Sequence, residues 1–126
     1  MNNMWDNPEL RSDNWGKARF KWVSNGGTNF RSSWELRFSR QMTELGIKWL
    51  YEPGTFKMSN GKRYTPDFFL PEFNMYIEIT PKAFMEYKVL VKIPEVRKYG
   101  FKAIVIHEGI WDYVIDVFRE KALSLK

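Results

Sequence analysis

Two short apolar runs, YTPDFF at residues 64–69 and MYIEIT at residues 75–80, each carry one carboxylate, Asp67 in the first run and Glu78 in the second. Aromatic and β-branched residues in runs of this length are typical of β-strands. A carboxylate inside such a strand is costly to bury without a partner. Two of them on neighbouring strands therefore predict a pair that shares a cation.

The alternation of side chains along a strand places Asp67 on the same face as Thr65 and Phe69, and Glu78 on the same face as Thr80. If the two strands pair, both carboxylates come within bridging reach of one ion. Mg²⁺ is commonly held by one or two carboxylates together with retained water. The expected cofactor is therefore Mg²⁺, with Mn²⁺ as an alternative.

A third acid lies near the start of an expected helix over residues 32–45. Its sequence begins with the capping box Ser-x-x-Glu, formed by Ser32 and Glu35, and Gly46 is a natural stop. Glu35 can serve as the helix-capping acid, as a third metal ligand, or as both.

The remaining pattern predicts an α/β domain with a mixed central β-sheet flanked by helices, in the order α-β-β-β-α-β-α. Asn60-Gly61 between two strand-like runs indicates a hairpin, and Pro94 predicts a kink or split in the second helix. The expected elements are strands at 55–58, 63–69, 75–80 and 101–106, with a further strand candidate at 47–51, and helices at 32–45, 83–99 and 111–125.

Length and composition set the class of protein. The chain has 126 residues, which suits a single core, preceded by an aromatic and basic N-terminal arm (1–28); residues 29–126 form the expected domain. Absent cysteines exclude disulfides and thiolate metal sites, and His107 is the single histidine. Without a membrane-length apolar run or a signal-peptide pattern, we expect a cytoplasmic protein with no membrane partner.

The net charge is +5, with a sequence pI near 9.5. This excess favours an anionic partner, nucleic acid first. Within the arm, basic residues alternate with aromatic ones, a pattern that can follow a phosphate backbone while rings lie near bases. An arm folded over the core with its charges in solvent is the equal alternative. The expected DNA-binding residues are Lys17, Arg19, Lys21 and Arg31.

The segments RSSWE (31–35), YTPDFFLP (64–71) and YIEITPK (76–82) together resemble the PD-(D/E)XK nuclease superfamily, closest to the phage endonuclease I type of Holliday-junction resolvase. The resemblance covers roughly residues 30–108. It implies a restriction-endonuclease-like core and Mg²⁺-dependent hydrolysis of DNA phosphodiester bonds. It also implies that Glu35, Asp67 and Glu78 are the metal-binding catalytic acids.

One position departs from the superfamily pattern, which has a lysine two residues after the second acid. Thr80 stands there instead. Lys82 is the expected catalytic cation, and Lys88 or Lys92 from the following helix is a second choice. A catalytically degenerate module that binds DNA without cutting it stays open for the same reason.

The expected function is therefore a metal-dependent endodeoxyribonuclease that acts on branched or structured DNA. A junction resolvase places two symmetric cuts, so a homodimer is expected, and no small-molecule organic cofactor is needed. A transposon-end endonuclease or a homing-type endonuclease of the same superfamily is the alternative.

Overall fold

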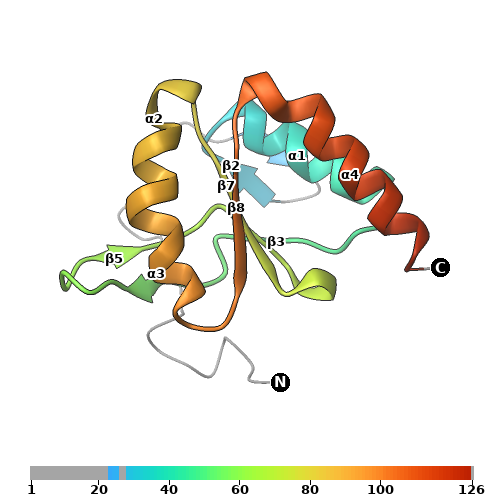
Figure 1. Cartoon of the computed structure of the whole chain (residues 1–126). Helices are drawn as coiled ribbons and strands as arrows, with labels where there is room; N and C mark the ends of the chain where they lie inside the picture. The colour runs from blue at the N-terminus through green and yellow to red at the C-terminus, as the bar shows by residue number, and fades with distance from the viewer. Residues whose placement is uncertain (1–22, 26–27, 126) are drawn as a thin grey trace.

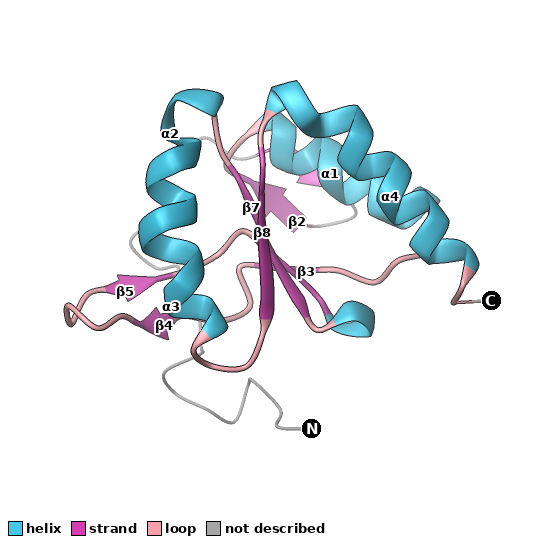
Figure 2. Ribbon diagram, in the orientation of Figure 1, coloured by secondary structure: helices cyan, strands magenta, loops and turns pink. Residues whose placement is uncertain are grey.

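The computed structural model describes residues 23–25 and 28–125, which form an α/β structure around a four-stranded sheet. Figures 1 and 2 show the sheet edge-on, with helices on both sides. The strands are β1 (Val23–Asn25), β2 (Thr28–Phe30), β3 (Leu50–Tyr51), β4 (Phe56–Lys57), β5 (Arg63–Tyr64), β6 (Phe68–Leu70), β7 (Met75–Ile79) and β8 (Lys102–Ile106). The α-helices are α1 (Ser33–Glu44), α2 (Lys82–Tyr87), α3 (Ile93–Arg97) and α4 (Trp111–Leu123). Shorter helical segments are η3 (Pro71–Phe73), η4 (Lys88–Lys92) and η5 (Glu108–Ile110).

The central sheet has the strand order β3-β6-β7-β8 and is mixed. β6 pairs antiparallel with β3 and with β7, whereas β7 and β8 run parallel. The parallel pair requires a crossover connection, which is made by α2, η4 and α3. The expected mixed sheet flanked by helices is confirmed.

Two apolar clusters cover the two faces of the sheet, as the alternation of side chains along β6 and β7 requires. On one face, Phe68 and Ile77 pack with residues of α1 and α4. On the other, Phe69 and Tyr76 pack with α3 and with the β4–β5 hairpin. Figure 1 shows this division, with α2 and α3 on one side of the sheet and α1 and α4 on the other.

Several elements lie close to their expected positions: α1, α4, β8 and the hairpin at Asn60-Gly61, in which β4 pairs with β5. The expected strand over 63–69 is wrong as a single element. It divides into β5 and β6 around Thr65 and Pro66, because proline has no N–H for a strand ladder. Asp67 therefore lies in a bend directly before β6.

The second helix is split, as Pro94 predicts, but the disturbance lies one turn earlier. α2 runs into the π-helical segment η4 before α3 begins, and Ile93 N–H bonds to Lys88 O. Pro94 has no N–H to donate to the preceding turn and its ring crowds the carbonyl there, and the wider turn makes room for it. Lys88 is the first residue of this π-helical segment.

The sequence predicts no strand in the N-terminal arm (1–28), but the end of the arm does form one. β1 and β2 form a small antiparallel hairpin, with Val23 opposite Phe30. The rest of the expected arm, including Lys17, Arg19 and Lys21, lies outside the described residues. Across the described ranges, no helix is both long and apolar enough to cross a bilayer.

Candidate active site

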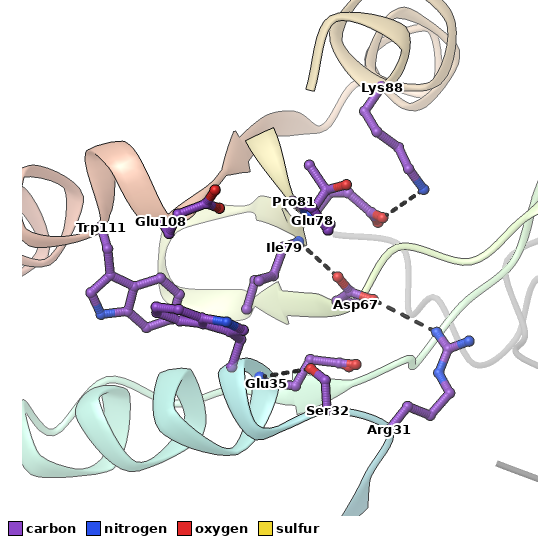
Figure 3. Close-up of a pocket in the computed structure, with 12 residues that line it drawn as sticks. Arg31, Ser32, Glu35, Asp67, Glu78, Ile79, Pro81, Lys88, Glu108 and Trp111 are labelled. Atoms are coloured by element: carbon purple, nitrogen blue, oxygen red, sulfur yellow. Dashed lines mark hydrogen bonds and ion pairs between the residues drawn. The ribbon is translucent and has the colours of Figure 1, made fainter. Parts of the chain in front are cut away.

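A cavity of about 500 Å³ opens where the start of α1, the bend before β6 and the end of β7 meet (Figure 3). All three acids expected from the sequence line it. Its wall is formed by Arg31, Ser32, Trp34, Glu35, Asp67, Glu78, Ile79, Thr80, Pro81, Lys88, Glu108 and Trp111. Residues far apart in the sequence thus build one site.

Glu35 is held in the first turn of α1. Ser32 is the N-cap, and its hydroxyl accepts the Glu35 N–H at 3.2 Å. The Glu35 carboxylate is buried, and the Tyr51 hydroxyl lies 3.1 Å from each of its oxygens. The Ser32 half of the predicted capping box is therefore present, whereas the carboxylate of Glu35 bonds to Tyr51 and lines the cavity.

Asp67 is buried, and its carboxylate reaches across to the neighbouring strand. The Ile79 N–H donates to Asp67 Oδ2 at 2.7 Å, and Arg31 Nη2 lies 3.7 Å from Asp67 Oδ1. The bend that follows Pro66 turns this side chain toward the end of β7. The strand that was expected to carry Asp67 is absent here, but the expected proximity to β7 is present.

Glu78 is the one charged side chain on β7, and two donors bond to its carboxylate. The Tyr64 hydroxyl bonds to Glu78 Oε1 at 2.6 Å, and Lys88 Nζ bonds to Oε2 at 2.9 Å. Figure 3 shows Lys88 approaching Glu78 on one side of the cavity and Arg31 approaching Asp67 on another.

The carboxylates disturb one another electrostatically. Burial raises the pKa of Asp67 well above its ordinary value, and the charges of Glu78 and Glu35 add to the rise. Burial also raises the pKa of Glu35 to about 7, although Arg31 and the Tyr51 hydroxyl oppose the shift. Such shifts on several groups in one cavity are characteristic of functional sites. A bound cation would favour the charged forms.

The three lysines proposed for the catalytic cation lie in different places. Lys82 is exposed at the first position of α2 and is not part of the cavity wall. Lys92 Nζ lies 5.2 Å from the centre of the Tyr64 ring. Lys88 alone of these three hydrogen-bonds a site carboxylate in the described structure. Thr80 lines the cavity, and its N–H bonds to Ile106 O.

Glu52 was missed by the sequence reading. Glu-Pro-Gly at residues 52–54 is a sequence typical of a turn, and a turn glutamate is usually exposed. Glu52 is instead only 1% exposed, and its Oε1 lies 2.5 Å from Arg31 Nη2. Glu52 directly follows β3, which pairs with β6 next to Asp67, and the Glu52 N–H bonds to Asp67 O at 2.8 Å. The one sequence signal for its position is that it comes directly after a strand.

The opposite wall of the cavity is aromatic. The rings of Trp34 and Trp111 are 4.9 Å apart, and the Arg37 guanidinium lies over both. Trp34 is 39% exposed, whereas Trp111 is buried and belongs to the core. The site therefore has one charged wall and one largely aromatic wall, with Glu108 beside Trp111 (Figure 3).

In the part of the chain that the structure describes, no three acidic, histidine or cysteine side chains are drawn together as a ready-made metal site. Protein donors instead contact the oxygens of Glu35, Asp67 and Glu78. Comparisons with protein-family models, with curated proteins and with solved structures gave no match to this chain.

Proposed function

We propose that the chain is a divalent-metal-dependent DNA endonuclease with a restriction-endonuclease-like core, acting on branched or structured DNA. The observation that carries the proposal is the convergence of Glu35, Asp67 and Glu78 on one cavity beside Lys88. They come from a helix, a bend and a strand, so no single local element explains their burial together.

The charge balance supports a divalent cation. Four buried carboxylates, Glu35, Glu52, Asp67 and Glu78, gather around two cationic side chains, Arg31 and Lys88. In their charged forms these groups carry two negative charges in excess, which one Mg²⁺ or Mn²⁺ ion would neutralise. Oxygen ligands of this kind match the preference of Mg²⁺.

Asp67, Glu78 and Glu35 would hold the ion or ions, and the donor set fits a hard cation. A bound Mg²⁺ would activate a water molecule and neutralise charge on the phosphate. Lys88 would stabilise negative charge that develops on the phosphate oxygens, because its ammonium group is already held at the edge of the cavity by Glu78. Tyr64 would keep the Glu78 carboxylate oriented through its 2.6 Å hydrogen bond.

We assign the role of the missing motif lysine to Lys88 in place of Lys82. Thr80 lines the cavity at the motif position, and the lysine that bonds to Glu78 comes from the segment after α2. Its Nζ lies 2.9 Å from Glu78 Oε2, so the positive charge stands beside the second acid.

A cleavage assay tests the proposal. The protein is incubated with a four-way junction, a linear duplex and a single strand, each with Mg²⁺, Mn²⁺ or EDTA. We expect cleavage that requires metal, prefers the junction and is lost in Asp67→Ala. If none of the three substrates is cleaved in a metal-dependent way, the proposal that the chain is a nuclease is wrong. If the Asp67→Ala variant still cleaves DNA, the assignment of the active site to this cavity is wrong.

A catalytically degenerate DNA-binding module remains the second candidate, favoured by Thr80 at the motif position. It predicts metal-independent binding to DNA with no cleavage. Preference for a defined linear sequence over a junction would instead favour a transposon-end or homing-type endonuclease. Junction cleavage in two symmetric cuts would favour a homodimer, which sedimentation of the protein on its own would test.

A further inference from the structure

Glu52 is an unusual residue for its position. Its backbone φ of 45° lies in the left-handed region, which glycine adopts easily and other residues rarely do. Its carboxylate is also buried completely, with 0% of the side chain exposed. Two unfavourable features at one residue call for a specific interaction that only this side chain makes.

That interaction is with Arg31. Glu52 Oε1 lies 2.5 Å from Arg31 Nη2, while the same nitrogen lies 3.7 Å from Asp67 Oδ1. The backbone of Glu52 is tied to the same place, because its N–H bonds to Asp67 O at 2.8 Å. Both the main chain and the side chain of Glu52 therefore secure the guanidinium relative to Asp67.

The cavity wall includes Arg31 but not Glu52. Glu52 thus stands behind the guanidinium, and a quarter of the Arg31 side chain remains exposed. A planar guanidinium is the side chain best suited to bind a phosphate in a directed way, and holding it in place reduces the entropy lost on binding. An anionic substrate also needs cations here, because the cavity is lined by carboxylates.

We propose that Arg31 binds a phosphodiester oxygen of the nucleic-acid backbone at the cavity, and that Glu52 is the positioning residue that holds Arg31 for this contact. The inference rests on the proposed function and names the group that receives the substrate's phosphate. Arg31 and Lys88 then flank the carboxylates from two sides, as Figure 3 shows for their side chains. Glu52 itself touches neither metal nor DNA.

The direction in which Glu52→Gln changes the affinity for DNA separates a positioning role of Glu52 from a purely electrostatic effect of its charge. Glu52→Gln removes a negative charge beside the DNA site, so charge alone predicts tighter DNA binding. If Glu52 instead holds Arg31 for a phosphate contact, the same change weakens binding. It also lowers the slope of log affinity against log salt concentration by about 1, as the loss of one phosphate contact does.

The experiment measures equilibrium binding of a fluorescent four-way junction by the full chain across a series of KCl concentrations, in Ca²⁺ to separate binding from hydrolysis. We expect Glu52→Gln and Arg31→Ala each to weaken binding about tenfold, and Glu52→Gln to have no further effect in the Arg31→Ala background. Glu95→Gln is the matched control, since Glu95 pairs with Lys98 outside this cavity and is expected to leave binding unchanged.

Unchanged or tighter binding by Glu52→Gln, or a further loss in the Arg31→Ala background, would overturn the inference while leaving the nuclease proposal intact. Failure of the wild-type protein to bind any DNA would overturn both. If Glu52→Gln does not fold, Arg31→Lys takes its place. That variant keeps the charge but loses the planar fork, so we expect weaker binding with an unchanged salt slope, and unchanged affinity would overturn the inference.

Discussion

Lys88 Nζ donates a 2.9 Å hydrogen bond to Oε2 of Glu78, a residue ten positions earlier in the chain. The contact joins the middle of the helical crossover, at the first residue of η4, to the strand that precedes it. It places an ammonium group beside Glu78, a carboxylate of the cavity wall.

Replacing Lys88 tests this placement. We expect Lys88→Met to lower kcat for metal-dependent cleavage by about 10²- to 10³-fold, because one preorganised charge at the developing phosphate charge is lost. Methionine keeps most of the apolar stem, so packing is largely preserved. Single-turnover cleavage rates provide the measurement.

Lys82→Met is the matched control, because it replaces a lysine by methionine in the same way. Lys82 is exposed at the start of α2. We expect cleavage close to the wild-type rate. The reverse result, with Lys82→Met inactive and Lys88→Met active, would return the catalytic role to Lys82.

The Tyr64 hydroxyl supports Glu78 from the opposite side of the carboxylate. Burial and the charge of Glu78 both raise the pKa of this hydroxyl, so it stays protonated and donates. Tyr64→Phe is expected to weaken Mg²⁺ affinity by about 10- to 100-fold, the usual effect of losing a group that orients a metal ligand. The Mg²⁺ concentration at half-maximal cleavage measures this change.

Tyr99→Phe removes a hydroxyl of the same kind that donates to Lys57 O and takes no part in the cavity wall. It is expected to leave the Mg²⁺ dependence unchanged. Equal Mg²⁺ dependence in both tyrosine variants would contradict a supporting role for Tyr64.

Phe68 directly follows Asp67 and is fully buried. Its ring contacts those of Phe30, Phe38, Trp49 and Tyr51. Phe68→Ala is expected to lower the free energy of unfolding by about 3–5 kcal/mol, the cost of a large cavity in an aromatic core. Phe84→Ala, at a ring that is 59% exposed, should change it by less than about 0.5 kcal/mol. Urea unfolding compares the two.

Much of the architecture was predictable because its signals are local. The cap at Ser32 begins α1, and the Asn60-Gly61 pair turns the β4–β5 hairpin. Apolar residues recur at helical spacing between 111 and 118, and they form the buried side of α4. Each signal depends on neighbours in sequence, so no knowledge of the tertiary structure was required.

The site was predictable in its acids but not in their partners. Asp67 and Glu78 stand out because strands seldom bury carboxylates, whereas Glu52 resembles any turn residue until Arg31 is brought next to it. The split of the expected strand at Pro66 and the π-helical turn that carries Lys88 are further cases in which tertiary packing decides between local alternatives. Pairings between distant segments are the information that one sequence lacks.

Glu35 gives a prediction about pH. Its pKa in the folded protein is raised from 4.5 to about 7, chiefly by burial, so the folded state keeps a proton that the unfolded chain releases. The stability linked to this group is therefore complete below about pH 4.5 and falls as the pH rises toward 7. The loss approaches about 3 kcal/mol above that pH, and Asp67 shifts in the same direction.

In EDTA, the melting temperature of the wild-type protein is thus expected to fall between pH 5 and pH 8 relative to that of Glu35→Gln, which cannot ionise at this position. Added Mg²⁺ should stabilise the wild-type protein more at pH 8 than at pH 5, because the ion binds the charged carboxylates. If the difference in melting temperature between the wild-type protein and Glu35→Gln stays constant across this pH range, ionisation of the buried Glu35 does not destabilise the folded state. A Mg²⁺ effect that is independent of pH would argue against carboxylate ligands whose pKa is raised.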